Sequence, residues 1–552
     1  MTVYSVPTLY EPATWPDPIE PIWQMLPARG ESPVGAKRTD LTLADRLFMA
    51  AVVNVPAERR PWGSITWLAD VFNTSRPTVY AIGKRGRAGM QALPARYPCL
   101  PDLPAQTSPV AEYPVVQVTP NRIRRSMLTL LFPGKVSGRD IQECLEAALD
   151  VSRSNATVSD LLHEAGRRAG KILDNVDLSP LGPVVLARDE LFTGRNPNLL
   201  LVEPHSLVIA GLYATQDRDA ETWACALLLT QDRGVQFAGL AEDGCIPYAA
   251  SCREAGLDTA IQRDTWHPLH DTDRVIGDVD REAKRLQKAA LKLEKQLTTR
   301  GWTDTVFVEW SSLTERSDTL RQQAARLRFW GDCLQDSVEI VDLRSGEIRD
   351  FAINAWMLNE TLAGLRQLDH PRIQTLTDKL VAQAPDLLTF LNAMTQPLAD
   401  WQARTAQHFP NPQWAAFFQS KVARLWRLEH ALRNGHRQYT QALVEARQWV
   451  AEFAIDDPIA HALAQDLLNL LERVVRTSSA AENINSVLRP FMNSRRESTD
   501  QTSRQLFLNL FWLWFNMHKF DRGPRTGKSP YQLAGIDLGT DDWLTLLGYP
   551  PD

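Results

Sequence analysis

The chain has 552 residues, of which 44% are hydrophobic and 23% are charged, which is the composition of a globular protein. This length predicts three to four folding units. The formal net charge of −6 disfavours a chain that is basic throughout, although local basic patches can still bind a polyanion. The six cysteines include no CxxC pair, which favours reduced thiols, and no apolar run approaches the roughly 18 residues of a membrane span. We therefore expect a cytoplasmic protein without a membrane partner.

The N-terminal region contains an extended segment and then helices. Residues 1–36 are rich in proline and lack periodicity, so we expect an extended arm. Residues 37–95 are predicted to form a helix-turn-helix domain. It starts with an amphipathic helix opened by Thr39 and Asp40, and two shorter helices with a tight polar turn between them follow.

The second of those shorter helices has features of a DNA-reading element. Ser75 is its predicted N-cap, and Pro77 lies in the first turn, where proline is tolerated. No acidic residue occurs between Val71 and Pro101, so the helix is basic. The N-terminal residues of such a helix contact base edges, and later basic residues contact phosphates. The residues predicted to bind DNA here are Arg76, Thr78, Tyr80, Lys84, Arg85 and Arg87. A helical hairpin with a solvated basic face is the alternative.

A proline-rich linker is predicted at 96–120, and a second helical domain at 121–178. Ser137 and Thr157 are the predicted N-caps of two of its helices. The domain resembles a second helix-turn-helix, and a linker role without base reading is equally open because acids accompany its bases. Its candidate DNA-binding residues are Arg122, Arg124 and Arg125.

From 179 to 272 the pattern changes to short apolar, β-branched runs interspersed with helices. The order is three strands, a helix, a strand, a helix and a strand, which is the order of an RNase H-like sheet. In such a sheet the first and fourth strands lie side by side. Asp189 ends the first strand and Asp243 ends the fourth, so we expect the two carboxylates to lie close together.

These acids are suited to phosphodiester chemistry. Two divalent metal ions about 3.5–4 Å apart stabilise the attacking and leaving oxygens of an in-line displacement, and Mg²⁺ prefers carboxylate ligands. The third predicted ligand is Glu482, at the start of a helix that would pack on the sheet. Glu190 and Glu242 compete with their neighbours for this role, and strand alternation favours Asp189 over Glu190.

The remaining regions are helical. Residues 273–475 are predicted to form an all-helical insertion domain, and residues 476–552 a basic C-terminal part of the catalytic domain. A heptad seam in the insertion predicts a long helix that pairs with another helix, most simply within the chain. The seam residues are Val279, Ala283, Leu286, Ala290, Leu293 and Leu297.

The sequence resembles the DDE transposases of bacterial insertion sequences that carry a large helical insertion before the final Glu. The motifs that carry the resemblance are ARDELF, GLAEDG, RDTWHPLHD, SSAAENINSVLRPFMNSRR and the closing RTGKSPYQLAGI. It implies a nucleoid-associated homodimer on DNA that uses two Mg²⁺ per site, with Mn²⁺ as a substitute. It also implies that Asn483 and Asn485 lie beside the site. Asp264, which follows the fifth strand, and His267 are further candidate accessory residues. DNA contacts are implied for Arg489, Arg495 and Arg496.

Two alternatives use the same fold. One is a domesticated transposase that binds DNA without cleaving it, and the other is an RNase H-like nuclease that does not transfer strands. A zinc site that combines His267 and His270 with Cys245 and Cys252 is a further hypothesis, although the spacing of the cysteines is poor for zinc.

Overall fold

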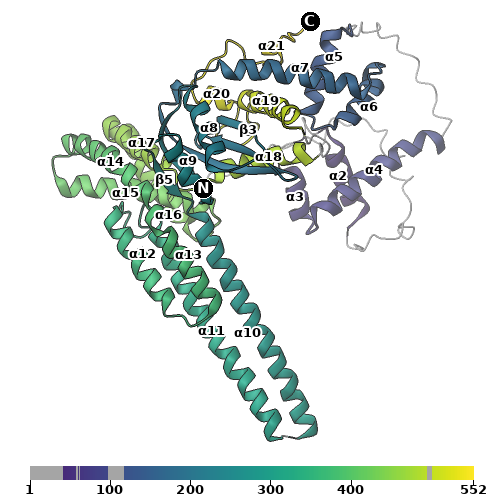
Figure 1. Ribbon diagram of the computed structural model, residues 1–552. Helices are drawn as coiled ribbons and strands as arrows, with labels where there is room; N and C mark the ends of the chain where they lie inside the picture. The colour runs from purple at the N-terminus through teal and green to yellow at the C-terminus, as the bar shows by residue number, and fades with distance from the viewer. Residues whose placement is uncertain (1–40, 57–59, 61–62, 97–116, 302, 494–499) are drawn as a thin grey trace. The chain divides into compact units, whose positions relative to one another are not determined.

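The computed structural model describes residues 41–56, 60, 63–96, 117–301, 303–493 and 500–552 (Figure 1). The chain divides into two compact units, residues 1–116 and 117–552, which are described separately. The predicted arm at 1–36 lies outside the described residues, as does most of the predicted linker. Within the described parts, no helix has both the length and the apolar character that crossing a membrane requires.

The described part of the first unit is helical. It contains α2 (Leu43–Asn54), α3 (Ser64–Val71) and α4 (Arg76–Arg96). As predicted, Ser75 caps α4, because its hydroxyl accepts a hydrogen bond from the Thr78 backbone N–H at 3.3 Å. The cap of α2 is Thr42, whereas Thr39 and Asp40, the predicted openers, lie outside the described residues. The small core of this unit contains Met49, Leu68, Ala69 and Val79.

A five-stranded mixed sheet organises the second unit, with the order β3-β2-β1-β4-β5. β1 pairs antiparallel with β2 and parallel with β4, so the first and fourth strands are neighbours as the sequence predicts. The bounds are β1 (Pro183–Thr193), β2 (Asn196–Val202), β3 (Ile209–Ala214), β4 (Gln236–Glu242) and β5 (Ala260–Arg263).

Helices cover the sheet and one of its edges. Side chains of α8 (Ala220–Gln231) and α9 (Ile246–Glu254) contact one face, and α18 (Ser479–Asn493) packs on β1 and β2. The edge strand β3 would otherwise have unpaired backbone groups. Side-chain amides of α19 (Gln501–Met517) bond to these groups instead, for example through Asn516, which pairs with both the N–H and the C=O of Ile209.

The second helical region, predicted as a separate domain at 121–178, has no core of its own. Its buried side chains belong to the same hydrophobic cluster as the sheet, α18 and α19, because α7 packs along α19. One predicted cap also differs: Ser154, not Thr157, caps α7, while Ser137 caps α6 as expected. The bounds are α5 (Pro120–Leu131), α6 (Gly138–Leu149) and α7 (Asn155–Asp174), followed by the short η2 (Ser179–Leu181).

The helical insertion lies between β5 and α18, and it has a separate hydrophobic core. Its helices are α10 (Trp266–Arg300), α11 (Asp304–Ser337), α12 (Phe351–Arg366), α13 (Pro371–Leu387), α14 (Thr389–His408), α15 (Pro412–Arg433), η3 (Arg437–Tyr439), α16 (Thr440–Asp456) and α17 (Pro458–Glu472). Two short helices, α20 (Pro530–Leu533) and α21 (Trp543–Leu546), follow α19 near the end of the chain.

The predicted heptad seam pairs α10 with α11 in an intrachain hairpin. Val279 and Ala283 are fully buried along it, and the Ser317 hydroxyl of α11 donates to the Ala283 carbonyl at 3.0 Å. Beyond the other helices of the insertion, the far half of the hairpin continues as two paired helices alone (Figure 1).

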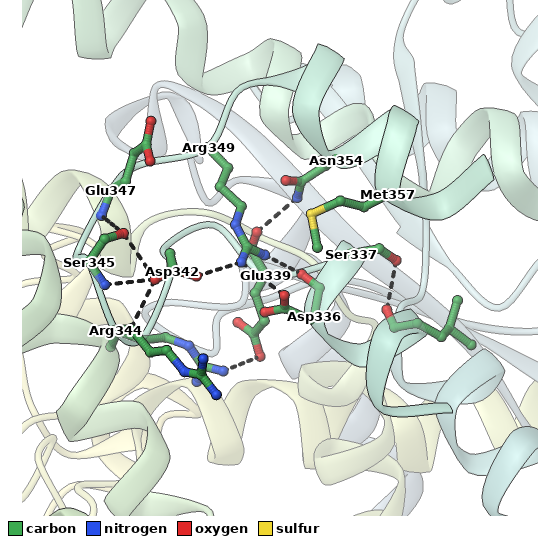
Figure 2. Close-up of polar contacts among 12 residues, drawn as sticks. Asp336, Ser337, Glu339, Asp342, Arg344, Ser345, Glu347, Arg349, Asn354 and Met357 are labelled. Carbon is green, nitrogen blue, oxygen red and sulfur yellow. Dashed lines mark hydrogen bonds and ion pairs between the residues drawn. The ribbon is translucent and has the colours of Figure 1, made fainter. Parts of the chain in front are cut away.

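The loop between α11 and α12 is held by a dense set of polar contacts (Figure 2). Arg349 donates to the side chains of Asp336 and Asp342 at 2.9 Å each. Burial raises the pKa of Asp342, but hydrogen bonds from Ser345 and Arg349 outweigh it and lower the pKa to about 2. These contacts therefore fix the conformation of the loop next to the segment that precedes α18.

One residue of this loop connects the insertion to the start of α18. The buried Glu339 carboxylate accepts a hydrogen bond from Arg476 at 2.9 Å and pairs with Arg427 of α15 at 3.1 Å. The Arg476 carbonyl in turn accepts from the Thr265 backbone N–H at 3.0 Å. Both entry and exit of the insertion are thus tied to one buried ionic contact.

Candidate active site

Asp189 does not end β1 as predicted, because the antiparallel pairing with β2 extends the strand to Thr193, whereas Asp243 directly follows β4. Strand alternation separates these acids from their neighbours. Arg188 and Glu242 are buried on the face that α8 and α9 cover, where Arg188 Nε donates to Glu242 at 2.7 Å. The guanidinium also lies 4.1 Å from the ring centroid of Tyr248. Since adjacent strand residues face opposite sides, Asp189 lies on the other face, beside α18.

The two competing acids therefore have structural partners. Glu242 forms the buried pair with Arg188, and Glu190 accepts hydrogen bonds from Trp223 at 3.1 Å and from Arg218 at 2.8 Å. The Arg188–Glu242 pair joins the two strands immediately beside Asp189 and Asp243. This cross-strand contact holds in register the two backbones that carry the candidate ligands.

The Asp189 carboxyl is buried, and the charges of two other candidate ligands act on it. The pKa of Asp189 is raised to about 6, mainly because the carboxyl is buried. Hydrogen bonds from the Glu190 N–H and from Asn485 Nδ2, both 2.7 Å, lower the pKa, while the charges of Asp243 and Glu482 raise it. The like charges of two strands and one helix thus converge near Asp189.

The first turn of α18 places Glu482 beside His267, at the start of α10. His267 Nε2 lies 3.2 Å from Glu482 Oε1. Ligand atoms of Asp264, His267 and Glu482 all lie within 4.8 Å of one another. Asp189 and Asp243 are not members of this tight group, so the compact part of the site combines one predicted ligand with two predicted accessory residues.

Asp264 is buried, and its carboxylate is occupied by protein donors. One oxygen accepts from the backbone N–H groups of Trp266 at 2.6 Å and His267 at 3.3 Å, at the start of α10. The other accepts from the backbone N–H and the hydroxyl of Ser478, each at 2.7 Å. Asp264 therefore fixes the starts of α10 and α18 relative to each other, which positions His267 and Glu482.

The donor set suits a hard divalent cation. Asp189, Asp243 and Glu482 supply carboxylate oxygens, which Mg²⁺ and Mn²⁺ prefer. The Asn485 side-chain oxygen is buried without a hydrogen-bond partner, beside the carboxylate that its Nδ2 contacts. Such an unsatisfied acceptor among crowded carboxylates is the environment that a cation or its bound water would satisfy.

The zinc hypothesis has no support from the arrangement of its residues. His270 stacks on Trp266, with ring centroids 4.6 Å apart, and Cys252 is buried near Arg188 on the opposite face of the sheet. In the described parts of the chain, no group of potential metal ligands brings together His267, His270 and the two cysteines.

The predicted DNA-binding residues differ in what they contact. Those on α4 are exposed except Thr78, whose hydroxyl bonds to that of Ser75. Arg87 Nε also donates to Asn54 at 2.8 Å.

The predicted DNA-binding arginines of the second unit differ in the same way. Arg125 bonds to Asp542 at 2.8 Å, and Arg122 pairs with Asp552 at 3.5 Å. The two latter arginines thus anchor the end of the chain to α5. Arg124 and Arg489 are exposed, while Arg495 and Arg496 lie outside the described residues.

The sequence did not single out the role of Arg525. It donates to the carbonyls of Pro204 and His205, at 3.2 and 2.7 Å, beside a cavity of about 280 Å³ next to the start of α18. The exposed Asn483, a predicted accessory residue, also lines this cavity. The RTGKSP motif that contains Arg525 was the available signal, but the motif alone did not indicate which element it would contact.

Comparison of the chain with protein-family models and with curated proteins finds no significant match.

Proposed function

We propose that this chain is a DNA transposase of the DDE type, with an RNase H-like catalytic domain and Asp189, Asp243 and Glu482 as its metal ligands. The observation that carries the proposal is the placement of three acids on adjoining elements: Asp189 lies on β1, Asp243 directly follows the neighbouring parallel strand β4, and Glu482 lies in the first turn of α18, which packs on β1. The strand order and the packing of α18 on β1 support an RNase H-like fold. The capped basic helix α4 supports DNA binding.

Different parts of the chain would bind the DNA and carry out the reaction. Exposed cations of α4 would hold the terminal repeats, and a homodimer would present one site to each transposon end. Two Mg²⁺ ions, when bound, would activate the attacking oxygen and stabilise the leaving oxygen. The protein groups contribute by position: Asn485 holds Asp189, and Asp264 holds the helix starts that carry His267 and Glu482.

A strand-transfer assay tests the proposal. Full-length protein is incubated in Mg²⁺ with duplexes that carry the DNA flanking the gene, and nicking and joining are followed for wild type and Glu482→Gln. Glutamine keeps the shape and removes the charge, so DNA binding should persist while cleavage falls about 100-fold or more. Glu294→Gln, on the far half of α10, is the matched control and should react at the wild-type rate.

The outcomes separate the proposal from its alternatives. Nicking and joining by wild type and binding alone by Glu482→Gln support the transposase. Metal-dependent cleavage without joining supports an RNase H-like nuclease. Binding by both proteins with no cleavage in Mg²⁺ or Mn²⁺ supports a domesticated DNA-binding protein, and wild-type activity of Glu482→Gln would remove Glu482 from the ligand set.

A further inference from the structure

The far half of α10 concentrates positive charge in a chain that is acidic overall. Between residues 281 and 300 there are seven basic residues and two acidic ones, Glu282 and Glu294, while the whole chain has a net charge of −6. The proximal part of the same helix is acidic, with Asp271, Asp273 and Asp278. The basic segment therefore begins near the start of α13, where Glu282 lies 3.9 Å from His370, and runs to the end of α10 at the tip of the hairpin.

Helical geometry places six of these cations on one face. At 3.6 residues per turn they occupy an arc of about 100°. The arc is opposite the buried seam through which α10 packs on α11, and neither Glu282 nor Glu294 lies within it. The six residues, here called the cationic stripe, are Arg281, Lys284, Arg285, Lys288, Lys292 and Lys295.

The cationic stripe is exposed and largely unpaired. All six side chains are exposed. Arg281 pairs with Asp278 one turn away. The other five form no ion pair with any residue that the structure describes, unlike most arginines of α14 to α16, such as Arg404, which pairs with Asp466 at 2.6 Å. Five of the six positive charges of the stripe therefore have no acidic partner among the described residues.

Its chemistry fits a polyanion better than a protein. Lysine is depleted at protein interfaces, whose centres are apolar, and the stripe offers only cationic heads. From Arg281 to Lys295 it extends roughly 20 Å along the helix axis. Duplex DNA of that length carries about twelve phosphate charges, more than enough to pair with six cations.

We propose that the cationic stripe of the α10–α11 hairpin docks on the phosphate backbone of duplex DNA without reading its sequence. This rests on the proposed function, because it assumes that the protein meets DNA. The hairpin would be a second contact on the same substrate, separate from the helix-turn-helix and from the acids of the site. This contact would give the helical insertion a role in holding DNA.

The salt dependence of binding tests this proposal directly. Full-length protein is titrated onto a labelled 40-base-pair duplex of scrambled sequence in EDTA, at several salt concentrations, so that cleavage plays no part. The triple variant Lys284→Gln/Lys288→Gln/Lys292→Gln should lower the slope of log K against log salt by about 2–3 and weaken binding roughly 10- to 100-fold near 0.1 M salt. Its thermal unfolding should match wild type, since the three side chains are exposed.

A matched control removes the same charge from the same domain. Arg404→Gln/Arg433→Gln/Arg447→Gln alters arginines that already pair with acids, so its salt slope should equal that of wild type. If the wild type binds DNA and the lysine variant has the same salt slope, the cationic stripe does not contact DNA. The proposed function would be unaffected by that result. A lysine variant that instead changes the oligomeric state in sedimentation would identify a protein interface and also overturn the proposed DNA contact. Absence of wild-type binding to any duplex would remove both proposals.

Discussion

Burial, neighbouring charges and hydrogen bonds all act on the carboxyl group of Asp189. Its carboxyl is buried against α18, and the negative charges of Asp243 and Glu482 lie near it, so the charged form is disfavoured and the pKa rises to about 6. Asn485 and the Glu190 N–H partly offset this through their hydrogen bonds. Without a cation, the folded state therefore carries an electrostatic cost at neutral pH.

That cost predicts a pH-dependent gain in stability for Asp189→Asn. The folded-state pKa lies above the unfolded value, so the penalty is absent below about pH 4, grows as Asp189 ionises, and is complete above about pH 6. In metal-free buffer at pH 7.5, the variant should be more stable than wild type by about 1–3 kcal/mol. The two proteins should unfold at similar temperatures at pH 4. Thermal unfolding at both pH values measures this, and a destabilised variant at pH 7.5 would contradict an electrostatic cost of the ionised Asp189 carboxylate in the folded state.

At this scale the sequence predicts the acids better than their surroundings. Alternation along β1 correctly separated Asp189 from Glu190. The partner of Glu242 is Arg188, 54 positions earlier, and no local pattern announces a cross-strand pair of that separation. The role of Asp264 was also missed, because it depends on Ser478, which the intervening insertion places far away in sequence.

Elements were predicted more securely than the contacts between them. The five strands, their order and the helix that carries Glu482 follow from periodicity and turn residues. The cap of α7 was predicted three positions late, because Ser154 and Thr157 are both good caps and the sequence does not choose between them. The covering of β3 by amides of α19 depends on tertiary packing, which short-range patterns do not encode.

The turn after β4 gives a prediction at the scale of an element. Gly244 has φ +86°, and a Cβ built there would lie 0.7 Å from Arg263 Nη1. Gly244→Ala should therefore strain the turn that carries Asp243 through its positive φ and push the Arg263 guanidinium away, and it should lower metal-dependent cleavage about tenfold or more. The control is Gly301→Ala in the hairpin turn, where φ is +83° and nothing lies within 4 Å of the added Cβ. Equal cleavage by both variants would show that the Asp243 turn does not need this geometry.

At the scale of the molecule, the chain divides into two units, and in the second a helical insertion lies between β5 and α18. The sequence predicts an insertion at 273–475 because the period changes from strands to long helices near 272 and a basic segment follows 475. Its first helix, α10, begins earlier, at Trp266, and its last helix, α17, ends at Glu472. The sequence did not anticipate that residues 121–178 share the core of the sheet, since an amphipathic helix does not indicate which partner covers its apolar face. The link from Glu339 to Arg476 shows that the insertion is also tied to the start of α18.

The most direct test of the central claim is whether the carboxylates of β1, β4 and α18 hold a divalent cation together. Mn²⁺ binding to the full chain would be measured by paramagnetic resonance at pH 8, for wild type, Asp243→Asn, Glu482→Gln and the exposed control Asp258→Asn. We predict that Asp243→Asn and Glu482→Gln each weaken Mn²⁺ binding about tenfold or more, while Asp258→Asn binds as wild type does. Wild-type affinity in Asp243→Asn would contradict the account, because the cation would then be held without the acid that directly follows β4.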